Sequence, residues 1–301
     1  MRSLVPTLSR VLAQADTHFL EGHFAAARKQ YATLMERAQD KADRSTEAVA
    51  RAMLAWCALK SRDFDTAERL LERVDDLLPN GTMDAESRVR RVRIRLTAEL
   101  EDRPSAKDSC RAFLAWAEEH DRSEDALDAC MLLASWAEVE ERVTWLERGL
   151  DRADGAPPVM AARAYTELGT ALDQIDQPDE ALRAYAQALE SYRGLGASRA
   201  LVAAEWAVGA SATRLEDWPL AQLRLEAALK GAQKRDDCTD LEVWIRADLA
   251  TTYASAGDVI EARRQVLQAV QAADEQQLDQ LWPERYAVLR EQARQLEVEG
   301  V

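Results

Sequence analysis

The sequence predicts an all-α protein: a right-handed α-solenoid of about seven antiparallel helix hairpins, followed by a C-terminal capping helix. Two observations carry this prediction. A pattern of small and large apolar residues recurs at intervals of about 40 residues, which is typical of helical repeat arrays. The chain also has only 11 glycines and 8 prolines among 301 residues, and 47% of its residues are hydrophobic. This composition favours an ordered helical chain over a disordered one.

The clearest hairpin is expected at residues 161–196. Apolar and small residues recur there at spacings of three and four: Tyr165, Leu168, Gly169 and Leu172, then Ala181, Tyr185, Ala188 and Leu189. These spacings place each set on one face of a helix. The small members let two antiparallel helices approach closely, while Tyr165 and Tyr185 fill the space between them. One such hairpin cannot bury its own apolar face, so neighbouring hairpins must stack on it.

This hairpin resembles the tetratricopeptide repeat, whose first helix has an aromatic residue before Leu-Gly and whose second has Ala before an aromatic. Tyr165-x-x-Leu168-Gly169 and Ala181-x-x-x-Tyr185 match that pattern. The aromatic usually found three residues after Leu-Gly is replaced by leucine, and the usual closing proline is missing. HEAT and armadillo repeats share the period of about 40 residues, but the recurring Leu-Gly signature favours tetratricopeptide repeats. The resemblance implies a non-enzymatic binding scaffold.

The first two hairpins are expected at residues 11–38 and 48–79. The second-helix pattern recurs in both: Ala27-x-x-x-Tyr31 and Ala67-x-x-x-Leu71. Gly22 can end the first helix of the first hairpin, because glycine readily adopts the left-handed conformation common at helix ends. A Pro-Asn-Gly run at 79–81 is expected to end the second hairpin sharply.

The third and fourth hairpins, expected at residues 84–116 and 123–153, follow the pattern least well. An Arg-Pro-Ser run at 103–105 separates the two helices of the third, whereas the fourth has no glycine or proline at its turn. The strongest break in the chain is Asp-Gly-Ala-Pro-Pro at 154–158. An ordinary loop between repeats explains it better than a hinge, because the segment is short. We therefore expect a single domain over residues 1–301.

The sixth and seventh hairpins are expected at residues 200–232 and 241–273. They repeat the Leu-Gly position of the first helix: Val208-Gly209 and Leu249-Ala250. A last helix covers 282–296, with Pro283 tolerated in its first turn. We expect this helix to act as a solubilising cap, which helical repeat arrays need at their ends.

The charge and hydropathy of the chain limit its partners and its location. The formal net charge is −15, so the surface lacks the positive charge that attracts nucleic acids and anionic membranes. We therefore expect no nucleic-acid and no membrane partner. No apolar run reaches the roughly 18 residues of a membrane span. The N-terminal residues 1–16 lack the apolar core of a signal peptide, so we expect a cytoplasmic protein.

No residue pattern predicts catalysis, a metal site or a cofactor. The four cysteines are scattered without a CxxC pair, and the three histidines add no ligand cluster. Buried reduced thiols are the expected state of these cysteines. Signatures of metalloproteases, serine hydrolases, phosphate loops and dinucleotide sites are absent, so we expect no enzyme and no cofactor. The abundance of arginine over lysine, together with many alanines, indicates a bacterial gene of high GC content.

In tetratricopeptide arrays the first helix of each hairpin lines a concave groove, and the resemblance implies partner-binding residues there. The first candidate site combines Trp56 with Arg88, Arg91 and Arg95. At 100° per residue, these arginines lie within about 60° of one another on their helix, off the apolar stripe. Guanidinium groups bind carboxylates well, so the expected ligand is an acidic peptide or a C-terminal carboxylate.

Two alternatives to this cationic site remain open. The arginines can instead pair with acidic residues of adjacent helices, or a shift of register can present Arg90, Arg91 and Ile94. The arrangement is similar in kind to the carboxylate clamps of some tetratricopeptide domains. The Lys and Asn pattern of those clamps is absent here, so no specific ligand carries over.

The second candidate site combines Trp206 and Trp244 with small neighbours. The residues expected beside them in the groove are Ala203, Ala207 and Ala210 in the sixth hairpin and Ala247, Asp248 and Thr251 in the seventh. Two indoles over a floor of methyl groups would accept the apolar anchor of a bound helix or extended segment. The alternative is that both tryptophans pack between adjacent repeats.

These features predict an intracellular adaptor whose groove binds a segment of another protein. Two other functions remain open. A ligand-sensing or peptide-sensing regulator would change its pitch on binding, although such regulators usually carry an effector domain that is not visible here. An inhibitory or structural subunit would bind through its second helices rather than its first.

Overall fold

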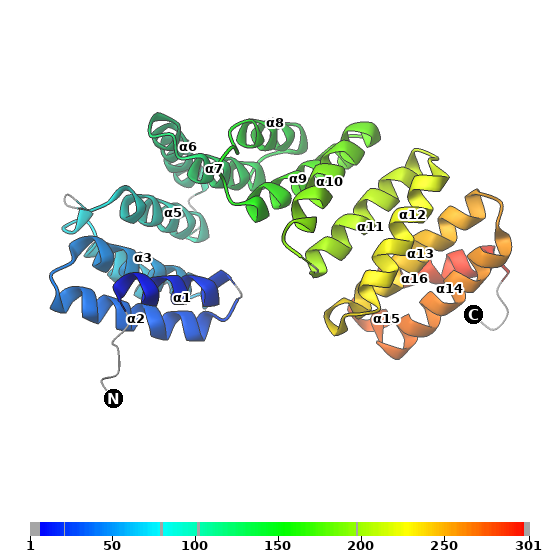
Figure 1. Ribbon diagram of the computed structural model, residues 1–301, viewed down its shortest axis with the longest axis horizontal. Coiled ribbons are helices and arrows are strands. Elements are labelled where there is room, and N and C mark those ends of the chain that lie inside the picture. The colour runs from blue at the N-terminus through cyan, green and yellow to red at the C-terminus, as the bar shows by residue number, and fades with distance from the viewer. Residues whose placement is uncertain (1–6, 21, 79–80, 101–102, 197, 298–301) are drawn as a thin grey trace. The chain divides into compact units, whose positions relative to one another are not determined.

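A computed structural model describes residues 7–20, 22–78, 81–100, 103–196 and 198–297 (Figure 1). Helices form all the regular structure of these residues, and no strand occurs among them. Contacts divide the chain into two compact units, Met1–Asp125 and Ala126–Val301. The segment at 154–158 lies inside the second unit. None of the described helices combines the length and the apolar character that crossing a bilayer requires.

The first unit consists of consecutive helix hairpins. Its helices are α1 (Leu8–Leu20), α2 (Phe24–Asp40), α3 (Arg44–Lys60), α4 (Phe64–Glu72), α5 (Met83–Glu99) and α6 (Arg103–Glu119). They pair as the sequence predicts, α1 with α2, α3 with α4 and α5 with α6. The run expected to end the second hairpin lies at 79–81, and its first two residues lie outside the described part of the chain.

The second unit continues the same architecture. Its helices are α7 (Ser123–Ser135), which spans the boundary, α8 (Val139–Leu150), α9 (Pro158–Gln174), α10 (Pro178–Arg193), α11 (Arg199–Arg214), α12 (Trp218–Ala232), α13 (Thr239–Ser255), α14 (Val259–Glu275), α15 (Leu278–Leu281) and α16 (Pro283–Gln295). The all-α solenoid predicted from the sequence is confirmed. The sequence did not predict the short helix α15 or the 3-10 turn Asp236–Cys238. All four cysteines are buried.

The close helix approach predicted for the fifth hairpin is present between α9 and α10. A Cβ atom at Gly169 would lie 2.6 Å from the ring of Tyr185, so only glycine fits there without a shift. The Tyr185 hydroxyl donates a hydrogen bond to Asp173 at 3.0 Å. The sixth hairpin repeats the arrangement, because a Cβ atom at Gly209 would lie 2.6 Å from Cγ of Leu225. The Leu-Gly signature therefore marks the crossing point of each of these hairpins.

The turns within the fifth and sixth hairpins share one backbone geometry. Asp176 and Glu216 adopt positive φ angles of 58° and 59°, and the following N–H donates to the carbonyl five residues earlier, as in Gln177 to Leu172 at 3.0 Å. This bond satisfies a carbonyl that the helix end would leave unpaired. The left-handed conformation is costly for residues other than glycine.

Replacing Glu216 by glycine is therefore expected to stabilise the protein by about 0.5–1 kcal/mol, because glycine adopts positive φ without steric cost. Urea unfolding followed by circular dichroism measures the change. As a matched control, Ala227→Gly in the exposed interior of α12 should lose about 1 kcal/mol. Destabilisation by both substitutions would contradict the assignment of the turn.

Candidate functional site

We use the name first-helix face for the side of each unit that the first helices of its hairpins form, α1, α3 and α5 in the first unit and α9, α11 and α13 in the second. In the second unit, hydrogen bonds link these helices directly. The Trp206 indole Nε1–H on α11 donates to the Asp248 carboxylate on α13 at 2.5 Å. The Gln292 amide on α16 donates to the Ala247 carbonyl on α13 at 2.9 Å. Helix α16 thus packs against α13 at the next first-helix position.

A pocket of about 410 Å³ lies between α13 and α16. Its lining residues are Trp244, Ala247, Asp248, Thr251, Arg285, Val288, Leu289, Glu291, Gln292 and Gln295. The four residues that the repeat register assigns to the groove of the seventh hairpin are all among them. The register inferred from Leu249-Ala250 therefore places the correct side of α13 toward this space.

Trp244 forms the apolar base of the pocket. It is 6% exposed, and the guanidinium carbon of Arg285 lies 4.5 Å from the centroid of its ring. The Trp282 ring packs edge-on against it at a centroid distance of 6.2 Å. Trp206 is partly buried and packs against the same apolar cluster. The two tryptophans thus pack between neighbouring helices, and Trp244 also borders the pocket.

Asp248 supplies the charge on the α13 wall. Its carboxylate accepts the hydrogen bond from Trp206, and among the described residues no basic side chain forms an ion pair with it. Burial raises the pKa of the Asp248 carboxyl, although the Trp206 hydrogen bond and the charge of Arg285 both act to lower it. A carboxylate that is costly to charge and lines a pocket is a candidate for ligand binding.

Asp248→Asn is expected to raise the free energy of unfolding at pH 7, on the order of 1 kcal/mol, because an amide still accepts from Trp206 without a buried charge. A carboxyl whose pKa is higher in the folded protein than in the unfolded chain destabilises the fold as the pH rises. The loss begins near the pKa of the unfolded chain and is complete above the pKa of the folded protein. The advantage of the variant should therefore grow with pH across that range and then stay constant. Urea unfolding of both proteins as a function of pH, from acid to neutral, measures it. An advantage that shrinks with rising pH would contradict the assignment.

In the first unit, the structure brings Trp56 and Arg95 together. The guanidinium carbon of Arg95 lies 4.6 Å from the centroid of the Trp56 ring. Phe19 of α1 contacts the same indole at a centroid distance of 4.9 Å. This cluster joins α1, α3 and α5 on their first-helix face.

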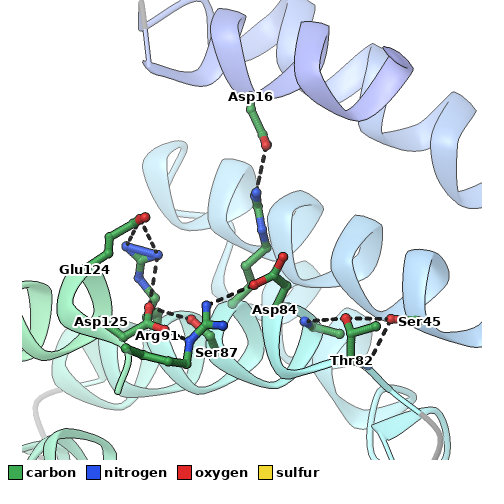
Figure 2. Close-up of polar contacts among 11 residues, drawn as sticks. Asp16, Ser45, Thr82, Asp84, Ser87, Arg91, Glu124 and Asp125 are labelled. Carbon is green, nitrogen blue, oxygen red and sulfur yellow. Dashed lines mark hydrogen bonds and ion pairs between the residues drawn. The ribbon is translucent and has the colours of Figure 1, made fainter. Parts of the chain in front are cut away.

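Among the arginines of the predicted cationic site, Arg88 contacts the residue that is most distant from it in the sequence. Its two terminal nitrogens donate to Asp16 of α1 at 2.9 and 2.7 Å; Asp16 is labelled in Figure 2. The Tyr31 hydroxyl donates to the same carboxylate at 2.6 Å. Burial and this hydrogen bond raise the pKa of the Tyr31 hydroxyl above its ordinary value. Asp16 therefore connects three helices through hydrogen bonds.

Arg91 faces the start of α7. Its guanidinium lies 3.5 Å from Glu124 and 3.6 Å from Asp125 (Figure 2). Asp125 is 1% exposed and also accepts hydrogen bonds from Ser87 at 2.6 Å and from Arg122. The buried carboxylate is thus satisfied by several donors, as buried charges usually are.

Arg88 and Arg91 thus pair with acidic residues of adjacent helices. Arg95 instead lies over the Trp56 ring and donates to the Arg91 carbonyl of its own helix. The residues of the alternative register, Arg90, Arg91 and Ile94, do not form an exposed group. Ile94 is 3% exposed, and the guanidinium carbon of Arg90 lies 5.2 Å from the centroid of the Trp116 ring on α6. The predicted side of α5 faces α1, α3 and the start of α7.

Sequence reasoning missed the residues that complete both sites. Asp16 is separated from Arg88 by 72 positions, and no local spacing connects them. Arg285 and Val288 belong to the terminal helix, which lies outside the repeat pattern. The apolar spacing of residues 282–296 predicts a helix there, but it does not indicate which residues that helix adds to the pocket.

Comparisons with known proteins identify the class of fold. No protein-family model matches the sequence, and no curated protein matches it either. Among solved structures, a signal transduction ATPase with numerous domains from Pyrococcus horikoshii, which carries a tetratricopeptide repeat sensor, is similar with a TM-score of 0.69 and 16% identity over 95% of this chain. The chain spans 44% of the length of that protein.

Two further structures are similar over nearly their whole length. The C-terminal part of a TPR repeat-containing protein from Cytophaga hutchinsonii has a TM-score of 0.54 and 15% identity, over 87% of this chain and 95% of that one. Aspartyl phosphate phosphatase F from Bacillus subtilis has a TM-score of 0.53 and 9% identity, over 99% and 96%. At these identities the similarity concerns the fold, which is that of a tetratricopeptide-repeat array.

Proposed function

We propose that this protein is a non-enzymatic interaction scaffold that binds a segment of another protein along the first-helix face of its second unit. The observation that carries the proposal is the pocket between α13 and α16. It is lined by the four residues that the repeat register assigns to the groove, and it leaves Asp248 without an ion pair among the described residues. A pocket of this kind supplies the anchoring point that peptide-binding grooves need.

The arginine cluster of the first unit is the weaker candidate for partner binding. An acidic ligand at Arg88 would have to replace Asp16, which already provides a two-point contact. Exchanging one carboxylate for another gains little free energy, and it leaves Tyr31 and Asp16 to find new partners. Binding of a carboxylate at Trp56, Arg91 and Arg95 remains a prediction for acidic partners.

Selection of peptides from a displayed random library tests the proposal, because the library samples partner segments of every chemistry. Selected peptides should bind the wild-type protein and lose at least about tenfold in affinity with Ala247→Phe, whose ring fills the pocket. The matched control is Arg183→Glu on α10, a second-helix residue whose side chain is 71% exposed. Loss of binding with Arg183→Glu alone would favour a structural subunit that binds through its second helices, and failure to select any peptide would contradict the proposal.

A regulator that senses a small ligand is the second candidate, and the size of the pocket favours it. A volume of about 410 Å³ lies within the range of small-molecule sites, roughly 300–1,000 Å³. This function predicts that ligand binding changes the radius of gyration measured by small-angle X-ray scattering. Binding without any change in radius would favour the scaffold.

A further inference from the structure

The pocket between α13 and α16 has a chemical preference that deepens the proposed function and rests on it. We infer that this pocket binds a cationic nitrogen group on a short alkyl stem, supplied by a lysine or arginine side chain of the bound segment. Among the described residues, three features of the pocket support this inference: its unpaired charge, its free hydrogen-bond acceptors and its apolar surface.

The first argument is the charge of Asp248. Two acidic side chains elsewhere on the first-helix face have basic partners: Asp16 pairs with Arg88 at 2.7 Å, and Asp173 pairs with Arg214. Within the described part of the chain, Asp248 has only the neutral indole donor of Trp206. Arg285 lines the same pocket, but its guanidinium stacks on Trp244 and forms no ion pair with Asp248 within 4.0 Å. A ligand cation would supply the missing charge.

The second argument is the set of hydrogen-bonding atoms that remain. The amide nitrogen of Gln292 donates to the Ala247 carbonyl at 2.9 Å and to the Thr251 hydroxyl at 2.8 Å. Because a carbonyl can only accept, this bond fixes the orientation of the amide, and the Gln292 Oε1 atom remains an acceptor. The Thr251 hydroxyl donates to the same Ala247 carbonyl at 3.3 Å. Asp248 and Gln292 therefore present acceptors, and a complementary ligand must donate.

The third argument is the apolar surface beside these acceptors. Trp244, Ala247, Val288 and Leu289 line the pocket together with the polar groups. Val288 is 70% exposed and Trp282 nearby is 39% exposed. An alkyl stem can cover these side chains while its charged end reaches the carboxylate, as lysine and arginine stems do on protein surfaces.

An anionic ligand fits the pocket poorly. Two carboxylates, Asp248 and Glu291, line it against the single guanidinium of Arg285. The face of Trp244 is already occupied by that guanidinium, so the anion would approach Asp248 without an additional cation to offset the repulsion. The balance of charges therefore favours a positive ligand.

The Trp206 indole provides a direct readout, because its N–H bonds to Asp248. In a ¹H–¹⁵N spectrum, assigned with Trp206→Phe, n-butylammonium and n-butylguanidinium should shift the Trp206 indole resonance. Butyrate and 1-butanol should not shift it at equal concentration. Asp248→Asn should weaken binding of both cations roughly ten- to a hundredfold, as expected for loss of a charge-assisted hydrogen bond. The matched control Glu275→Gln removes an equal charge from an exposed position on α14 and should leave binding unchanged.

Several outcomes would overturn the inference. Equal binding of butanol or butyrate, or cation binding that survives Asp248→Asn, would show that the carboxylate does not select the ligand. Thermal unfolding of the Asp248→Asn variant confirms that it is folded.

The displayed peptides separate this inference from the proposed function. If peptides bind and Ala247→Phe blocks them, but substituting their lysines and arginines by methionine leaves affinity unchanged, the scaffold stands and the cationic preference is wrong. If the butyl cations bind through Asp248 and no peptide is selected, the preference for a cation stands. The cation that the pocket binds is then a small amine rather than a peptide side chain, and the proposed scaffold function fails.

Discussion

Gly209→Val is expected to lower the free energy of unfolding by about 3 kcal/mol, because it forces extra carbon atoms into a filled helix crossing. The new Cβ atom would lie 2.6 Å from Cγ and 3.1 Å from the backbone nitrogen of Leu225. Neither atom is the mobile end of a side chain, so α11 and α12 would have to separate. Urea unfolding followed by circular dichroism measures the loss.

Two further variants test the cause of this effect. Gly194→Val places a Cβ atom 3.6 Å from the Ser191 carbonyl, an ordinary contact, and should change stability by no more than about 0.5 kcal/mol. Leu225→Ala creates space at the crossing, so the double variant Gly209→Val/Leu225→Ala should lose less stability than the sum of the two single losses. Strict additivity would contradict a direct contact between these positions.

Asp16→Ala has the second-largest expected effect, a loss of about 2 kcal/mol. The substitution removes both hydrogen bonds of Arg88 and the acceptor of the Tyr31 hydroxyl, and it leaves a partly buried guanidinium unpaired. Breaking a fully buried ion pair costs about 3–5 kcal/mol, and this value is reduced here because solvent reaches both partners, whose side chains are 27% and 26% exposed. Urea unfolding measures the change.

The control for Asp16 is an exposed ion pair in the same unit. Asp108 and Arg111 pair at 3.0 Å, but their side chains are 79% and 51% exposed. Asp108→Ala should therefore change stability by less than about 0.5 kcal/mol. Equal losses from Asp16→Ala and Asp108→Ala would show that the link between α1 and α5 contributes no more than a surface pair.

The register of the fold could be predicted from the sequence because it depends on short-range spacing. The Gly169 and Gly209 positions repeat with the helices that surround them, and Leu249-Ala250 places Asp248 and Thr251 on the correct side of α13. The hairpin expected at 161–196 corresponds to α9 and α10, which together cover 158–193.

The composition of the sites depends on contacts that no local pattern encodes. Asp16 meets Arg88 only because α1, α3 and α5 stack, and a carboxylate on an amphipathic helix gives no sign of its partner. Arg285 covers Trp244 from a helix that does not obey the repeat. The sequence therefore indicated which residues of α13 line the pocket, but not the residues of α16 opposite them.

Site-specific photo-crosslinking of a selected peptide tests the central claim most directly. A benzophenone amino acid is placed at position 251 on the exposed edge of the pocket, or at position 183 on α10, and the crosslinked peptide is identified by mass spectrometry. The account predicts crosslinks at position 251, through residues next to a lysine or arginine of the peptide, and none at position 183. Crosslinks at position 183 with none at position 251 would contradict it.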